Sequence, residues 1–210
     1  TLEAGIGNIN IEGDSTIKGT DVTIHTATGN VTSGKNTTVE ATTDNILVDA
    51  SLRADMLGTL KAENGSVTVK AGLGATVGTV IAKDANIEAN TGDIILEEDV
   101  TAGDISLDAK RGYVITKSLT ATDDSITVNA GIDATLNGNL TAENGDVSVT
   151  AKNNAAITGT VTANEVTLTA TEGDLTAGND ITANGRMATL VAGRDIAVAG
   201  GIKAPAGGVD

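Results

Sequence analysis

The stretch LTAENGDVSV, which runs from Leu140 to Val149, carries the pattern that predicts the fold of this chain. An apolar residue is followed two positions later by Ala, then by a polar corner, and then by alternating apolar residues. The stretch LKAENGSVTV, from Leu60 to Val69, is nearly the same. Looser copies recur along the whole chain, and such self-similarity at a fixed period indicates a repeat architecture.

Each copy opens on one apolar residue, which we name its anchor. Successive anchors are 19 to 22 residues apart. Alanine follows two positions later in every copy except the first, where Gly19 stands. The ten anchors are Ile17, Val39, Leu60, Val80, Val100, Leu119, Leu140, Val161, Ile181 and Ile202.

Two further apolar runs follow each anchor. One alternates, as in Val147 with Val149, and a shorter one closes the copy, as in Leu96, Ile115 and Leu136. Corners rich in Gly, Asn and Asp separate the runs. Three short strands in roughly 20 residues predict an all-β fold, a parallel β-helix (β-solenoid) of about ten turns. Stacked at about 4.8 Å, these turns would form a rod roughly 45–50 Å long, with Val, Ile and Leu inside.

Parts of the chain fit this pattern less well. We expect a bulge or short loop between Val22 and Thr43, and residues 50–59 are predicted to protrude. The end at Pro205 is either a wide corner or a linker. Because no shift in composition marks a boundary, residues 1–210 are interpreted as a single β-helical repeat domain. Neither terminus has a polar cap, so we expect it to be a fragment of a longer shaft.

The composition excludes several classes of function. The chain has 26 Gly, one Pro, no Phe, no Trp and one Tyr, so Val, Ile, Leu and Ala must fill a narrow interior. It has no Cys, hence no disulfide and no thiolate metal site. A net charge of −15 repels nucleic acid and anionic membranes. No apolar run approaches the length of a membrane-spanning helix, and no signal peptide begins at Thr1. We therefore expect no nucleic-acid partner and no membrane insertion.

Three segments carry a family resemblance: AENGDVSVTA (142–151), TANEVTLTATEGDLTAGNDI (162–181) and LVAGRDIAVAGGI (190–202). The pattern resembles the repeat region of filamentous haemagglutinin-type exoproteins, the large adhesins of bacterial two-partner secretion. The resemblance implies a right-handed β-helix, secreted to the extracellular space or cell surface of a Gram-negative bacterium. It also implies roles in adhesion, cell-cell contact or biofilm, with host or bacterial surface receptors or glycans as partners. The family's N-terminal secretion domain carries Asn-Pro-Asn motifs, which a chain with Pro205 as its only Pro cannot contain.

Three functions are considered. The first is the structural shaft of a surface fibre, and the second is a self-polymerising extracellular filament or sheath subunit that associates through open β-helix ends. The third is a carbohydrate-active β-helix enzyme or binding module, for which the paired carboxylates Asp123 and Asp124 are the best candidates. The only histidine, His25, lies about five turns or roughly 24 Å from them. We therefore expect no enzyme and no catalytic residue.

Other polar groups have simpler explanations. The acidic run at 97–99 and the cluster Lys110, Arg111 and Tyr113 are expected to be solvated corners. His25 has no partner His or Cys for a metal, and no cofactor is expected. The Gly-Asp corners could bind divalent ions weakly, but the favoured interpretation is a turn in which Asp satisfies its own backbone. These corners are Gly13-Asp14, Gly92-Asp93, Gly103-Asp104, Gly145-Asp146 and Gly173-Asp174. Glycosylation sequons occur at Asn30, Asn36, Asn64 and Asn139.

Overall fold

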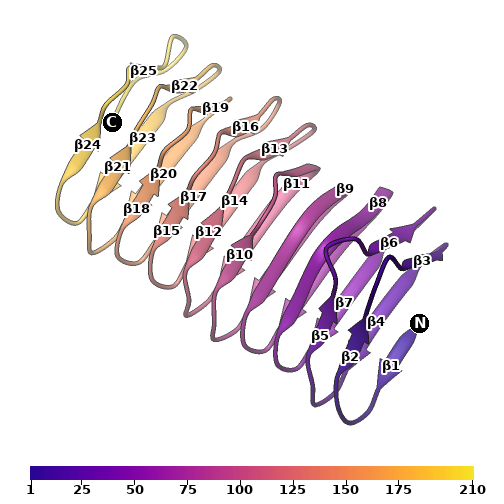
Figure 1. Cartoon of the computed structure of the whole chain (residues 1–210). Coiled ribbons are helices and arrows are strands. Elements are labelled where there is room, and N and C mark those ends of the chain that lie inside the picture. The colour runs from indigo at the N-terminus through magenta and orange to yellow at the C-terminus, as the bar shows by residue number, and fades with distance from the viewer.

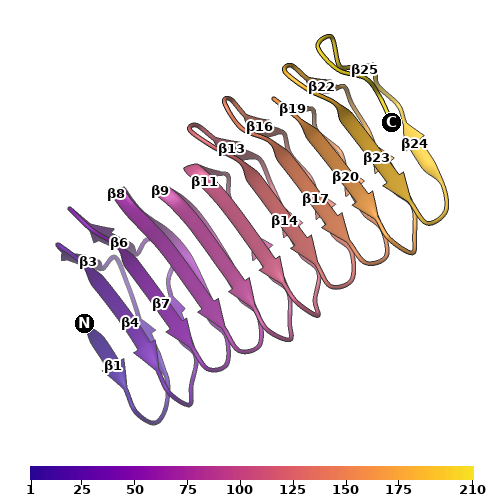
Figure 2. The same cartoon turned by 180° about the vertical axis from the view of Figure 1, so that it is seen from behind.

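The computed structural model describes residues 1–210 and contains 25 β-strands and no helix. All strand pairings join consecutive turns in parallel, as in the pairing of β14 with β17 and of β17 with β20. Figures 1 and 2 show the turns stacked in one row, with the N-terminus at one end and the C-terminus at the other. The predicted β-solenoid of about ten turns is therefore confirmed, and its right-handed sense stays a prediction. No helix long and apolar enough to cross a membrane is present.

The strands form three faces, which we name by their content. The anchor face contains β3 (Thr16–Gly19), β6 (Thr38–Ala41), β13 (Leu119–Ala121), β16 (Leu140–Ala142), β19 (Val161–Ala163), β22 (Ile181–Ala183) and β25 (Ile202–Lys203). The long face contains β1 (Leu2–Ala4), β4 (Val22–Thr26), β7 (Ile46–Ala50), β14 (Ile126–Ala130), β17 (Val147–Ala151), β20 (Val166–Ala170) and β23 (Ala188–Ala192). The short face contains β2 (Ile9–Ile11), β5 (Val31–Ser33), β10 (Ile94–Leu96), β12 (Val114–Thr116), β15 (Ala134–Leu136), β18 (Ala155–Ile157), β21 (Leu175–Ala177) and β24 (Ile196–Val198). Three longer strands continue through corners and contribute to more than one face: β8 (Ala54–Ala71), β9 (Ala75–Ala89) and β11 (Val100–Ala109).

The ten anchors lie opposite one another on the anchor face. Each pairs in register with the next, from Ile17 with Val39 through to Ile181 with Ile202. The anchors from Val39 to Ile181 are at most 1% exposed and belong to one continuous apolar core. Burial of each such side chain contributes about 1.5–3 kcal/mol. The stack of anchors is therefore a major part of what holds successive turns together.

Alternation along each strand separates the core from the surface. In β17, Val147, Val149 and Ala151 are buried, while Ser148 and Thr150 between them are partly exposed. The same in-and-out order repeats in the strands above and below, so like residues stack on like. Because successive side chains of a strand point to opposite faces, one alternating pattern is enough to build both the core and the surface.

Residues 50–59 do not protrude, which corrects the prediction. Ala54 and Met56 are fully buried and open β8, where they pair with Ala75 and Val77 of the next turn. The pattern is hard to see because β8 has extra residues relative to β9, with register shifts between Met56 and Thr59 and between Ala62 and Ser66. These insertions lie at corners, where a turn can lengthen without disturbing the core.

In the other two irregular segments the irregularity also lies at the corners between strands. Val22 pairs with Ile46, 24 positions later, so the turns here are longer than those that follow. The predicted short loop lies at residues 34–37, where the Thr37 N–H donates to the Gly34 carbonyl at 3.1 Å. After Pro205 the chain turns back onto the long face, and Val209 pairs in parallel with Ala188. Of the two interpretations of this end, the structure has the wide corner.

On the short face, β12 does not bury Ile115, although the apolar run that closes this copy predicted an inward position for it. Ile115 points outward and is 36% exposed, whereas its neighbours Val114 and Thr116 are buried. Thr116 therefore occupies a core position and pairs in register with Leu136. It is 1% exposed, and its hydroxyl has no hydrogen-bond partner. A buried hydroxyl without a partner destabilises the folded state.

Replacing Thr116 with Val should stabilise the protein by about 1 kcal/mol, because the shape is kept and an unpaired polar group is removed. The measurement is a urea unfolding curve compared with that of the unsubstituted chain. Thr26 provides the matched control, since it is equally buried but its hydroxyl donates to the Gly7 carbonyl at 2.7 Å. Thr26→Val should destabilise, and a similar gain from both substitutions would contradict the explanation.

Candidate functional surface

Polar side chains at the corners bind one turn to the next. At the corner between the long and short faces, the Asp133 carboxylate accepts hydrogen bonds from the Asn154 N–H at 2.9 Å and its side-chain amide at 3.2 Å. Asn154 Oδ1 accepts from the Asp174 N–H at 2.9 Å, and Asp174 accepts from the Asp195 N–H at 3.2 Å. Each side chain thus satisfies a backbone donor of the following turn. At Asp174 the expectation that a Gly-Asp corner satisfies its own backbone is therefore corrected, because its carboxylate accepts from the next turn.

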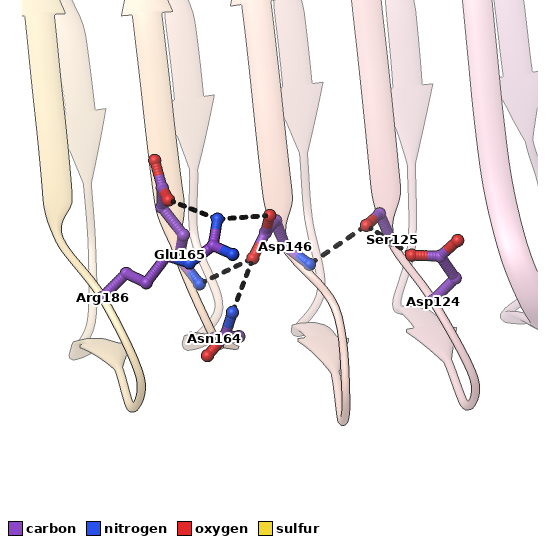
Figure 3. Close-up of polar contacts among 6 residues, drawn as sticks. All are labelled: Asp124, Ser125, Asp146, Asn164, Glu165 and Arg186. Carbon is purple, nitrogen blue, oxygen red and sulfur yellow. Dashed lines mark hydrogen bonds and ion pairs between the residues drawn. The ribbon is translucent and has the colours of Figure 1, made fainter.

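A second column of polar groups lies at the corner between the anchor and long faces. Its members Asp124, Ser125, Asp146, Asn164, Glu165 and Arg186 are drawn in Figure 3. Asp146 accepts from the Glu165 N–H at 3.0 Å, and its own N–H donates to the Ser125 hydroxyl at 3.1 Å. The Arg186 guanidinium lies 3.3 Å from Glu165 and 3.9 Å from Asp146. Four successive turns are therefore linked by side chains in addition to the strand hydrogen bonds.

Further along this corner, carboxylates crowd one another. Asp104 pairs in register with Asp84 and lies near Asp124. Partial burial raises the pKa of Asp104 above its ordinary value of 3.8, and the neighbouring carboxylates Asp124 and Asp84 raise it further. The Ser125 N–H, which donates to Asp104 at 3.3 Å, acts in the opposite direction. At neutral pH the fold therefore holds a carboxylate in a place that favours the neutral acid.

This arrangement predicts a pH dependence of stability. Since the folded pKa of Asp104 is raised, its stabilising contribution is present below the unfolded pKa and is lost as pH rises through the folded pKa. Asp104→Asn should therefore stabilise the chain at pH 7, by less than about 1 kcal/mol because solvent screens a partly exposed group. The advantage should shrink toward pH 4. Urea midpoints at both pH values test this.

The control for this prediction is Asp133→Asn, at a column position between Tyr113 and Asn154 with no carboxylate directly above or below. It keeps an oxygen that can accept the Asn154 hydrogen bonds. Its effect on stability should not follow the pH trend of Asp104→Asn. The same gain from Asp104→Asn at pH 7 and pH 4 would contradict the role of carboxylate crowding.

The candidate catalytic residues do not come together. His25 is in β4 and Asp123 lies just before β14, five turns along the rod. The His25 Nδ1 atom lies 3.2 Å from Asp49, while Asp124 accepts a hydrogen bond from the adjacent Ser125 hydroxyl at 3.0 Å. The two carboxylates Asp123 and Asp124 are exposed at a corner.

The acidic run at 97–99 is engaged in contacts between turns. Glu97 forms an ion pair with Lys35 at 2.9 Å, and Glu98 pairs with Lys117 at 3.1 Å. Asp99 accepts a hydrogen bond from the Ser118 N–H at 3.0 Å. The hydrogen bond from Lys35 to Glu97 raises the pKa of the lysine, and the opposite charge of Glu97 adds to this. This run therefore links turns of the rod.

The Gly-Asp corners are distributed over all three corners of the solenoid. Asp104 and Asp146 lie between the anchor and long faces, Asp93 and Asp174 between the long and short faces, and Asp14 between the short and anchor faces. The structure has no group of three or more His, Cys, Asp or Glu side chains that could hold a metal ion. These five Asp residues therefore do not lie in one stack.

Two of the four sequon asparagines belong to the corner columns. Asn30 and Asn139 accept hydrogen bonds from the backbone N–H groups of Arg53 and Thr160, both at 3.0 Å. Asn36 is exposed and its amide donates to Asp14 at 2.9 Å. Asn64 is also exposed and has only a long contact of 3.4 Å to the Thr42 carbonyl. Of the four side chains, that of Asn64 is therefore held least by hydrogen bonds.

The cluster around Tyr113 is partly engaged. The Lys110 ammonium contacts Glu88 and Asn90, the latter at 3.1 Å, and the hydrogen bond to Glu88 raises the lysine pKa. Arg111 forms no ion pair, and Tyr113, which is 40% exposed, donates its backbone N–H to Asp93 at 2.8 Å. These residues mark the edge of the long face.

Sequence reasoning missed two shallow depressions on the long face. The larger holds about 360 Å³ beside Asp49, Ser51, Lys70, Glu88 and Asn90. The smaller holds about 190 Å³ and is lined by Thr68, Lys70, Asn86, Ile87, Glu88, Ser106 and Asp108. Most of their residues are outward positions of β7, β8, β9 and β11 or of the corners that follow, so the signal is spread over about 60 residues of sequence.

Comparison with known proteins adds no identification. The chain matches no family model, no curated protein and no solved structure.

Proposed function

We propose that the chain is a section of the structural shaft of a secreted bacterial cell-surface fibre, acting in adhesion, cell-cell contact or biofilm. The observation that carries the proposal is the unbroken register of the anchors from Ile17 to Ile202. A continuous stack of this kind extends in one direction only, which suits a fibre. The repeat segments that resemble filamentous haemagglutinin-type exoproteins support the location and the class of function.

The mechanism of a shaft is reach and stiffness. Each turn adds about 4.8 Å of length, and every turn is held by three parallel strand pairings as well as by corner side chains. The outer surface of the anchor face presents a row of threonines, since Thr101, Thr120, Thr141, Thr162 and Thr182 pair in register. Together with the net charge of −15, this polar surface keeps a long β structure in solution. As proposed, the chain is an interaction protein and catalyses no reaction.

Immunogold electron microscopy tests the location. Antibodies raised against the purified 210-residue chain should label fibres outside the outer membrane of intact cells that express the complete reading frame. Brief protease treatment of intact cells should remove the label, whereas a cytoplasmic protein should survive. Labelling that appears only after the cells are permeabilised would contradict the proposal.

Self-polymerisation is the second candidate, and one observation favours it. The outermost turns expose apolar side chains: Ile6 is 90% exposed at one end, and Ile196 and Val209 are 48% and 56% exposed at the other. These edges also have backbone groups that can pair with another strand. Sedimentation of the purified chain should then show growth with concentration that Ile196→Lys prevents. A single short species at all concentrations would count against polymerisation.

The enzymatic alternative has its own test. Turnover of a uronic acid polymer by the purified chain, lost on Asp123→Asn or Asp124→Asn, would overturn the proposal that the chain is not an enzyme. We expect no turnover, because the two exposed carboxylates have no histidine near them and Asp124 is hydrogen-bonded to Ser125.

A further inference from the structure

The two depressions on the long face form one continuous polar surface. They share Lys70 and Glu88, which stand next to each other in register on β8 and β9. The larger depression lies toward β7 and the smaller toward β11, so together they extend along the rod axis. The larger, of about 360 Å³, is within the range of ligand sites, which typically hold about 300–1,000 Å³, and the smaller adds about 190 Å³ beside it.

Lys70 is an unpaired cation at the centre of this surface. It stands in register between Asp49 and Glu88, yet no carboxylate oxygen lies within 4.0 Å of its ammonium group. Both neighbours already have partners, because Asp49 contacts His25 and Glu88 contacts Lys110. The Lys70 ammonium, with three N–H donors, is therefore free to bind a ligand oxygen.

The charges around Lys70 select the chemistry of that ligand. Asp49, Glu88 and Asp108 oppose Lys70 and Lys110, so the surface is nearly balanced and slightly negative. A polyanion would meet these carboxylates and the net charge of −15. An apolar ligand would find few apolar side chains among mostly polar ones. A neutral molecule rich in hydroxyl groups fits, because each hydroxyl can donate to a carboxylate and accept from an ammonium or amide.

We propose that the long face binds a neutral polysaccharide, whose sugar units occupy the two depressions on either side of Lys70 and Glu88. The depressions are open and follow one another along the axis, which favours an extended chain over a compact ligand. The inference rests on the proposed function, since it names the class of glycan that a fibre of this kind would hold. The binding assay below uses the isolated chain, so its outcome is independent of where the fibre is located.

Affinity electrophoresis of the purified 210-residue chain provides the test. Gels containing dextran, galactomannan or arabinoxylan serve as neutral probes, and gels containing alginate or hyaluronan serve as acidic probes. At least one neutral polymer should retard the chain, and the acidic polymers should not. Lys70→Met and Glu88→Gln should each weaken the retarding interaction at least tenfold. Because both side chains point outward from the sheet, the variants should keep the far-UV circular dichroism of the parent.

The matched controls are Lys152→Met and Glu63→Gln, which remove an exposed lysine and an exposed glutamate outside the depressions. Both should bind like the parent chain. The proposal would be overturned if no neutral polymer retards the chain, if retardation is confined to the acidic polymers, or if the controls weaken binding as much as the substitutions at Lys70 and Glu88. If electron microscopy shows no labelled fibres on intact cells but a neutral polymer still retards the purified chain, the proposed shaft is refuted and the polysaccharide site is not.

Discussion

Deleting residues 119–139 should leave a folded rod that is one turn shorter. This segment begins at the anchor Leu119 and ends just before the anchor Leu140, so its removal places Leu140 next to Val100 in the same register. Since each turn contacts only its neighbours, the chain loses one turn and one interface while all the other interfaces keep their partners. Far-UV circular dichroism should stay β-rich, and urea unfolding should stay cooperative.

A deletion of half that length is the control. Removing residues 119–128 places Asn129 at the anchor position of Leu119 and deletes β13 and part of β14, so the shortened turn cannot pair in register with the turn on either side. Because a domain has a net stability of only about 5–15 kcal/mol, the loss of both interfaces should strongly destabilise the rod at this turn. Limited proteolysis should cut this variant rapidly after residue 118. If both deletions behaved alike, register would not be what holds the fold together.

The substitution Gly145→Ala should destabilise the chain by about 3 kcal/mol, since added volume in a close-packed site forces the backbone to shift. A Cβ atom at Gly145 would lie closer than 3.0 Å to the carbonyl oxygen of Asp124 in the preceding turn. The obstacle is backbone, which cannot move aside without opening the strands next to it. Urea unfolding monitored by circular dichroism measures the loss.

Gly34→Ala is the matched control for Gly145→Ala. The atom nearest to a Cβ at Gly34 would be the Thr37 hydroxyl oxygen at 3.6 Å, which is an ordinary van der Waals contact. This control should be neutral or stabilise by up to about 1 kcal/mol, because Ala restricts the unfolded chain more than Gly does. A loss of stability as large as that from Gly145→Ala would mean that conformational freedom, and not the close approach of two turns, explains the glycines.

The sequence pattern indicates that corner glycines allow a turn with positive φ, but at most corners they allow two turns of the backbone to approach closely. Only Gly7 and Gly13 have a positive φ, at 102° and 75°. At Gly65, Gly145 and Gly159 the backbone instead passes within contact distance of a carbonyl in the turn before, where no side chain fits. A single sequence shows the glycine but not the neighbour, because that neighbour is about 21 residues away.

Much of the core was predictable because it depends on local alternation. Val147 and Val149 alternate with Ser148 and Thr150, and the inside and outside of β17 follow from that order alone. Ile115 shows the limit of the argument. In the sequence Val114-Ile115-Thr116 either set of alternate residues is apolar enough to face inward, and the pairing with β10 and β15 places Val114 and Thr116 inside.

The candidate surface was less predictable than the core. Lys70 is unremarkable in the sequence, and its importance comes from Asp49 and Glu88, which lie 21 and 18 residues away and are both engaged elsewhere. The corner insertions in β8 shift this register by several residues relative to a uniform period. Small errors in turn length therefore change which outward side chains are neighbours.

The stretch LTAENGDVSV by itself determined that the chain is built of similar turns, where each turn begins, and which of its residues face the core. These properties depend on residues that are adjacent or two apart, and a strand has the same alternation wherever it is placed. Only the tertiary structure decided that Asp146 binds the Glu165 N–H of the next turn, that Gly145 lies against Asp124, and that Thr116 is buried without a partner. The physical reason is that contacts between turns depend on the exact length of every corner between them, and the period alone leaves those lengths open.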